Sequence, residues 1–216
     1  MERRSNQGTR GASMIHNLFP IPIGMYKIDR DLTDEELSFV NDQSRHDNTG
    51  NTTSNERTVL KHDALSNLNE FIEESLKDYF QSVYEPKNEV ELQITQSWLN
   101  YTEPGQFHHK HAHPNSFVSG VFYVHGDREK DRIFFYKDGY QQIKLPTEDW
   151  NAWNSESWWF EAGTGDLILF PSSLTHMVPT TESDQTRISL SFNTFPVGEV
   201  GKEEELTGLH VEGAHG

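Results

Sequence analysis

The chain of 216 residues contains no cysteine. Disulfide bonds and thiolate metal sites are therefore excluded. Basic residues are also scarce, with 18 Lys and Arg against 34 Asp and Glu, which gives a formal net charge of −16. This charge favours solubility and argues against nucleic acid as a partner, because a phosphate backbone is bound by a basic surface.

Long apolar runs are missing as well. No stretch approaches the roughly 18 apolar residues that a membrane-spanning helix needs, and residues 1–13 lack the apolar core of a signal peptide. We therefore expect a cytoplasmic protein with no membrane partner, which the lack of cysteine also fits. We expect residues 1–13 to be a disordered leader, residues 14–196 one domain, and the Gly- and Glu-rich residues 197–216 a flexible acidic tail.

Two helices are expected in the first part of the chain. Thr33 and Glu36 have the spacing of a capping box, which predicts a helix start there. Apolar side chains recur every three or four residues from about Asp63 to Val83, which predicts a second helix. Residues 18–28 carry two prolines and are expected to be extended at a sheet edge, whereas residues 47–57 have the composition of a loop.

From Val90 the period of the apolar residues changes to two, which is typical of a strand that continues through Asn100. Further short β-rich segments follow at 117–124, 132–136, 165–170 and 187–195. Short strands without helices between them indicate a β-sandwich or barrel. The predicted fold is therefore mainly β, with the two helices at its N-terminal side.

Histidines are concentrated in one short segment. The whole chain has 11, and four of them, His108, His109, His111 and His113, fall within six residues. In an extended strand every second side chain faces the same way, so His111 and His113 would project together, as would His109 and His111. Two neighbouring imidazoles suit a first-row transition metal. His176, which follows an apolar strand and a proline turn, is the best candidate for a third ligand.

A polar strand face follows His176 in the sequence. Arg187 and Ser189 alternate with apolar residues, so both lie on one face of the strand expected at 187–195. If this face lines a metal cavity, the guanidinium and the hydroxyl form a receptor for a carboxylate. The alternative is a solvated polar face. The first interpretation predicts a cosubstrate that chelates the metal at one end and is anchored by Arg187 at the other.

In these three motifs the sequence resembles the iron(II)/2-oxoglutarate-dependent dioxygenases. That superfamily has His-X-Asp/Glu, a distal His, and an Arg or Lys about ten residues later. More narrowly, the chain resembles a bacterial and phage branch of 2-oxoglutarate/iron(II) oxygenases over about residues 16–196. The supporting stretches are 18–22, 98–100, 111–116, 119–124, 169–176 and 187–193.

The resemblance implies a double-stranded β-helix, or jelly roll, that binds iron(II) through His111, His113 and His176. It further implies that 2-oxoglutarate is bound by Arg187 and Ser189, with Asn100 and Tyr123 beside them. The expected reaction uses O2 to hydroxylate an unidentified protein or small molecule, which Asn115, Trp150 and Trp153 would contact. The tryptophans lie in a long connection of the kind that often binds ligands, although packing over the end of the barrel is the alternative. For the oligomeric state, the sequence leaves a homodimer as one alternative.

One residue departs from the superfamily pattern, because His113 stands where a carboxylate is usual. Three interpretations follow: three histidines bind the metal, water replaces His113, or His109 and His111 are the ligands in a shifted register. Two other functions also stay open. The first is a cupin-like dioxygenase with three histidines and no 2-oxoglutarate. The second is a jelly-roll binding module without catalysis.

Overall fold

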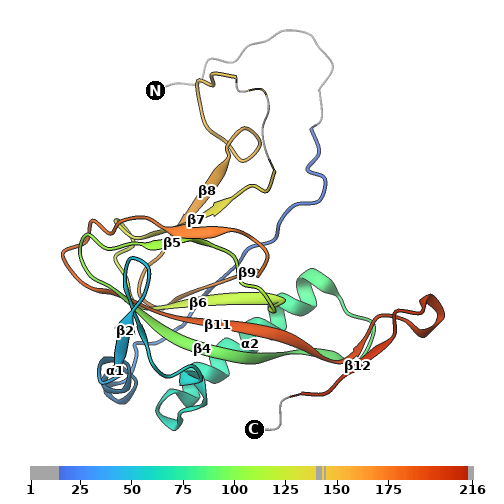
Figure 1. Cartoon of the computed structure of the whole chain (residues 1–216), viewed down its shortest axis with the longest axis horizontal. Coiled ribbons are helices and arrows are strands. Elements are labelled where there is room, and N and C mark those ends of the chain that lie inside the picture. The colour runs from blue at the N-terminus through green and yellow to red at the C-terminus, as the bar shows by residue number, and fades with distance from the viewer. Residues whose placement is uncertain (1–14, 140–142, 144, 214–216) are drawn as a thin grey trace.

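The computed structural model describes residues 15–139, 143 and 145–213. Within them, two antiparallel sheets lie face to face, and α2 (Ser66–Tyr84) packs against the larger sheet on the side away from the smaller one (Figure 1). The larger sheet has the order β1-β9-β6-β11-β4-β3-β2, with β12 paired to β11, and the smaller has the order β5-β10-β7-β8. This architecture is the expected jelly roll with N-terminal helices.

The strands of the larger sheet are β1 (Gly24–Lys27), β2 (Arg45–Asp47), β3 (Thr52–Ser54), β4 (Val90–Thr102), β6 (Val118–His125), β9 (Asp166–Pro171), β11 (Arg187–Val200) and β12 (Leu209–Val211). The strands of the smaller sheet are β5 (His108–His111), β7 (Arg132–Tyr136), β8 (Ser157–Glu161) and β10 (His176–Val178). Three short 3-10 turns complete the description: η1 (Val59–Lys61), η2 (Asp63–Leu65) and η3 (Glu203–Glu205).

Both predicted helices form. The helix α1 (Asp34–Asn41) begins with the expected capping box, in which Thr33 and Glu36 each accept a hydrogen bond from the other's backbone N–H. The second helix, α2, begins three residues later than the apolar pattern predicts, because Asp63–Leu65 form a 3-10 turn first. In the described part of the chain, no helix combines the length and apolarity needed to cross a bilayer.

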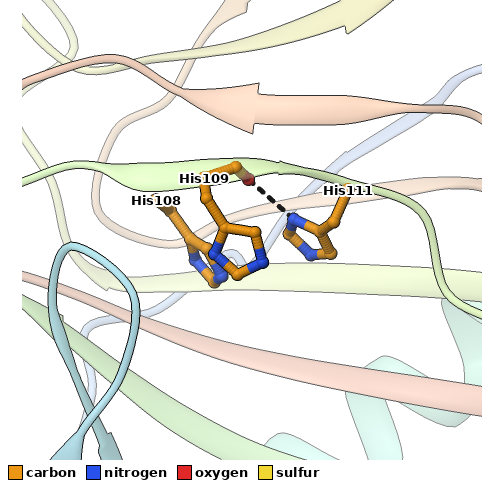
Figure 2. A group of neighbouring side chains, drawn as sticks. All are labelled: His108, His109 and His111. Carbon is orange, nitrogen blue, oxygen red and sulfur yellow. Dashed lines mark hydrogen bonds between the residues drawn. The ribbon is translucent and has the colours of Figure 1, made fainter.

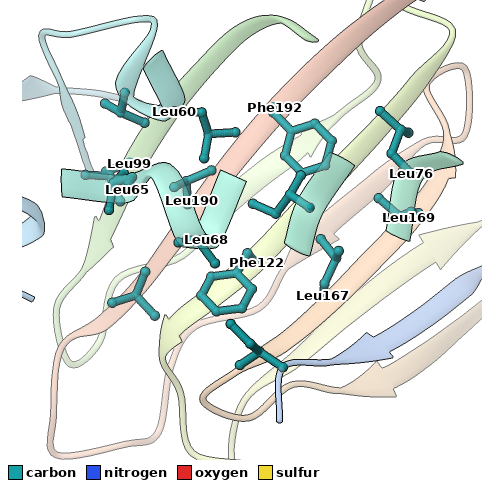
Figure 3. Packing of buried hydrophobic residues seen from close by; sticks show 14 of the residues in the cluster. Leu60, Leu65, Leu68, Leu76, Leu99, Phe122, Leu167, Leu169, Leu190 and Phe192 are labelled. Carbon is teal, nitrogen blue, oxygen red and sulfur yellow. The ribbon is translucent and has the colours of Figure 1, made fainter. Parts of the chain in front are cut away.

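The main core lies between α2 and the larger sheet (Figure 3). Leu68, Ile72 and Leu76 of the helix pack against Phe122 and Leu190 of the sheet, and all five are at most 2% exposed. Their spacing along α2 is the spacing that predicted the helix. Burial of such side chains stabilises the fold by about 1.5–3 kcal/mol each, before the entropy of ordering them is subtracted.

The strands β6 and β9 of the larger sheet are buried on both faces, and the two faces differ. In β9, Leu167 and Leu169 belong to the core under α2, whereas Ile168 and Phe170 belong to a second core between the sheets. In β11 the apolar residues pack toward α2, while the polar residues that alternate with them face the space between the sheets. This alternation creates a polar cavity inside an otherwise apolar sandwich.

Two expectations about the chain are wrong. Residues 47–57 are not a plain loop, because β2 and β3 form a hairpin there whose turn contains Gly50 at φ +93°. Residues 197–213 are not a disordered tail, because β11 extends to Val200 and pairs with β12. The strand β3 pairs with β4, and β12 pairs with β11. Local composition does not reveal such pairings with distant strands. The leader expected at 1–13 lies outside the described residues.

Candidate metal centre

The pairing of β5 with β10 brings the two histidine motifs together. His111 lies directly opposite His176 in this antiparallel pair, and their rings are 4.4 Å apart between centroids. His113 follows β5, and its backbone N–H donates a 2.9 Å hydrogen bond to the carbonyl of Ser172. Its ring lies 4.9 Å from His111 and 5.0 Å from His176. One ring nitrogen from each of the three lies within 4.8 Å of the others, so together they could hold one metal ion.

Hydrogen bonds to the backbone orient two of these rings. The Nδ1 of His111 lies 2.8 Å from the carbonyl oxygen of His109, and the Nδ1 of His176 lies 3.0 Å from that of Leu174. A carbonyl can only accept, so each Nδ1 carries the proton and each Nε2 keeps its lone pair. This is the arrangement by which proteins usually prepare imidazoles for a metal.

Burial keeps the three imidazoles neutral at physiological pH. Desolvation, reinforced by neighbouring histidines, lowers the pKa of His176 to about 3 and that of His113 to about 4. The pKa of His111 is lowered by burial too, although its hydrogen bond to His109 opposes the change. Metal binding requires deprotonated ligands, so these groups need no proton release before they bind a cation at pH 7.

The three histidines line a narrow cavity of about 30 Å³ between the two sheets. Arg187, Ser189 and Tyr123 line the same cavity from the larger sheet. The polar face of β11 therefore points toward the histidines, as expected from its alternation. The volume is close to that of one water molecule.

Arg187 has a carboxylate partner that the sequence analysis missed. Its Nη1 donates to the Oδ1 of Asp131 at 3.1 Å, and the two side chains are only 3% and 2% exposed. Asp131 also accepts from the Thr181 hydroxyl at 3.1 Å and from the Asp127 backbone at 2.9 Å. Asp131 is one of 34 acidic residues, and no local pattern distinguishes it from the others.

Among the described residues, two polar side-chain atoms of the larger sheet near this cavity are buried without a hydrogen-bond partner. They are the hydroxyl of Tyr123 and the Oδ1 of Asn100, whose Nδ2 donates to Ser191 at 3.1 Å. Burial also raises the pKa of the Tyr123 hydroxyl, so this group is a neutral donor. A buried hydroxyl without a partner costs about 1–3 kcal/mol, and a bound ligand could satisfy it.

A cluster of buried hydroxyls fixes the loop that carries His113. The Oγ of Ser172 lies 2.7 Å from that of Ser116 and 2.8 Å from that of Ser119, and Ser119 donates to Asn193 at 2.9 Å. Because the carbonyl of Ser172 also accepts from the backbone N–H of His113, the cluster ties this candidate ligand to β6, β9 and β11. The position of His113 is therefore set by several elements.

The residues predicted to contact a substrate lie outside the cavity lining. Asn115 is exposed and has a positive φ of 56°. Trp150 and Trp153 lie in the connection from β7 to β8 and are 70% and 61% exposed. His108, which had no assigned role, does line the cavity.

Comparison with known families supports the expected resemblance. Residues 96–193 match the model of a family described as "Putative 2OG-Fe(II) oxygenase". This range contains all three histidines, Arg187 and Ser189, and the predicted resemblance is confirmed. No curated protein matches the chain.

Solved structures show the same fold. A 2OG-Fe(II) oxygenase family oxidoreductase from Burkholderia pseudomallei superposes with a TM-score of 0.54 at 14% identity, over 79% of this chain and 84% of that one. HygX from Streptomyces hygroscopicus, solved with nickel, 2-oxoglutarate and hygromycin B bound, gives a TM-score of 0.53 at 13% identity, over 79% and 82% of the two chains. At these identities the likeness concerns the fold alone.

Proposed function

From the match of residues 96–193 to the 2OG-Fe(II) oxygenases, we propose that this chain is an Fe(II)- and 2-oxoglutarate-dependent oxygenase that hydroxylates its substrate. The observation that carries the proposal is that His111, His113, His176 and Arg187 line one cavity. A metal-binding triad and a cation that can hold a carboxylate are the two parts that such a cosubstrate requires.

His111, His113 and His176 would hold the iron. Their neutrality, their orientation by backbone carbonyls and the mutual approach of their nitrogens fit a divalent transition metal. Three protein ligands on one side leave positions for a cosubstrate and O2. When bound, iron(II) would supply the site at which O2 is activated, with 2-oxoglutarate as the electron donor that becomes succinate and carbon dioxide. The protein would contribute binding, orientation and exclusion of water.

Arg187, Ser189 and Tyr123 would bind the far carboxylate of 2-oxoglutarate. Asp131 accepts from the Nη1 of Arg187, and a guanidinium has five N–H donors, so the remaining donors could bind a second anion. The hydroxyl of Tyr123 has no partner of its own and can donate to the same carboxylate. Asn100 is next to Ser189 across the β4–β11 pairing and completes this polar surface.

The substrate is proposed only by class, as a protein or small molecule with a C–H bond to be hydroxylated. Asn115 immediately follows the loop residues His113 and Pro114, which places it beside the metal ligands in the chain. Trp150 and Trp153 offer exposed aromatic surface on the β7–β8 connection. These three residues are the substrate contacts that we propose.

A second candidate function has one observation in its favour. The candidate site offers three histidines and, among the described residues that line the cavity, no carboxylate, as a cupin-like dioxygenase that does not use 2-oxoglutarate would have. Arg187 would then hold the carboxylate of the substrate. Binding of 2-oxoglutarate by the metal-loaded protein separates the two candidates.

The test is to measure 2-oxoglutarate affinity by calorimetry in the presence of Mn²⁺, and succinate formation with iron(II) and O2. Arg187→Ala should weaken 2-oxoglutarate binding by about 10- to 100-fold, because a charge-assisted hydrogen bond contributes about 1.5–3 kcal/mol. The exposed Arg57→Ala is the matched control and should leave the affinity unchanged.

Arg187→Ala also leaves Asp131 unpaired and could disturb folding, so Tyr123→Phe serves as a second variant. It removes only the unpartnered hydroxyl. It should therefore weaken the binding of 2-oxoglutarate without lowering the stability of the protein. If the parent protein binds the metal but neither takes up 2-oxoglutarate nor forms succinate, the proposed function is wrong.

A further inference from the structure

A second group of histidines lies beside the first. In the pairing of β5 with β10, His176 is opposite His111, but Val178 is opposite His108. Moving from one pair to the other therefore takes three residues along β5 and only two along β10, which is a β-bulge. This bulge places consecutive residues on the same side of the strand. His108 and His109 therefore point in the same direction as His111, toward the larger sheet (Figure 2), whereas the ammonium of Lys110 lies 3.7 Å from the ring centroid of Tyr136.

The three rings are close enough to share one ion. Ring centroids are 5.3 Å apart for His108 and His109, 4.8 Å for His108 and His111, and 4.7 Å for His109 and His111. One nitrogen from each lies within 4.8 Å of the other two. In addition, the Nδ1 of His109 is buried and has no hydrogen-bond partner. Neighbouring imidazoles without a carboxylate among them are better explained by a shared cation than by packing alone.

His111 belongs to both histidine groups, and only one of its ring nitrogens is available to bind a metal. Its Nδ1 is bonded to the carbonyl of His109, so only Nε2 can bind a metal. An ion held by His108, His109 and His111 therefore competes with an ion held by His111, His113 and His176 for the same lone pair.

We propose that His108, His109 and His111 form a second metal site that excludes occupation of the first. Its ligands are three imidazoles, which favour a borderline divalent cation such as Zn²⁺ with a tetrahedral arrangement. An ion at this site leaves only His113 and His176 to the first site. Zinc bound at the second site would therefore prevent a metal ion from binding at the first site.

The test is to titrate metal-free full-length protein with ZnCl₂ by calorimetry and to measure the zinc bound per chain. The parent should bind one zinc, not two. His113→Gln/His176→Gln should still bind one, and the further change His111→Gln should abolish binding. His108→Gln/His109→Gln should also bind one zinc, now at the first site. The exposed His210→Gln is the matched control.

Circular dichroism of each metal-free variant verifies that it is folded, and the count of zinc per parent chain needs no variant. Two zinc ions per parent chain would overturn the mutual exclusion. Failure of the folded His113→Gln/His176→Gln variant to bind zinc would overturn the second site and leave the proposed function intact. Loss of binding in His108→Gln/His109→Gln instead would speak against the first site and hence against the proposed function.

Discussion

The residue at position 113 would set the charge of the proposed metal centre. With three neutral imidazoles an iron(II) site would keep the full double charge of the ion, whereas an aspartate there would reduce it by one unit. His113→Asp should therefore bind iron(II) at least as tightly as the parent, because the carboxylate adds electrostatic attraction in a buried site. His113→Ala should bind it at least about tenfold more weakly. Anaerobic calorimetry with iron(II) measures both.

If His113→Asp loses iron as completely as His113→Ala, position 113 does not contribute a ligand. In that case His109 or water would complete the site. Circular dichroism of both metal-free variants verifies that they are folded, since the backbone N–H of His113, which bonds to Ser172, is unchanged in each.

Some residues of the candidate site stand out in the sequence, and others do not. His111, His113 and His176 stand out because histidines are dense in one segment and because one follows a strand and a turn. Asp131 could not be predicted, since its role depends on a contact with Arg187 over 56 residues of sequence. The position of His108 depends on a bulge between β5 and β10, and no periodicity in the sequence indicates this bulge.

At the scale of elements, the close approach of β6 and β11 depends on a glycine. Gly120 lies opposite Phe192, and a Cβ at Gly120 would overlap the Phe192 ring. Gly120→Ala should destabilise the protein by about 1–3 kcal/mol, the usual cost of an overpacked core. Urea unfolding measures this change. Phe192→Leu should relieve the overlap, so the double variant should lose less than the sum of the two single losses. Additive losses would contradict this close approach.

Elements with a strong local pattern could be predicted, and those held by distant partners could not. The apolar spacing in α2 and the alternation of apolar and polar residues in β4 were sufficient to predict these two elements. The hairpin of β2 and β3 consists of short polar strands held against β4, and Thr53 donates to the carbonyl of Leu99. β12 likewise depends on the far end of β11. Such pairings follow from the assembled sheet and not from local composition.

For the whole molecule, the buried histidines make stability depend on pH. Burial, as the largest cause, lowers the pKa of His108 to about 2, of His176 to about 3 and of His113 to about 4, against 6.5 when unfolded. Below about pH 6.5 the unfolded chain binds more protons than the folded one, so stability should fall as the pH drops. The free energy of unfolding in chelator should therefore decrease from pH 7 to pH 5.

The control for this pH effect is a variant in which His108, His113 and His176 are all glutamine. Its stability should change less over the same range. An equally steep decline in that variant would assign the pH effect to other groups.

The most direct test of the central claim is an anaerobic titration of iron(II) and then 2-oxoglutarate, followed by visible absorption. We expect the weak charge-transfer band of a 2-oxo acid chelated to iron(II), present only with both components and absent in His176→Ala. Bound iron without the band, at saturating 2-oxoglutarate, would contradict a 2-oxoglutarate-dependent oxygenase. Failure to bind iron would contradict the metal centre itself.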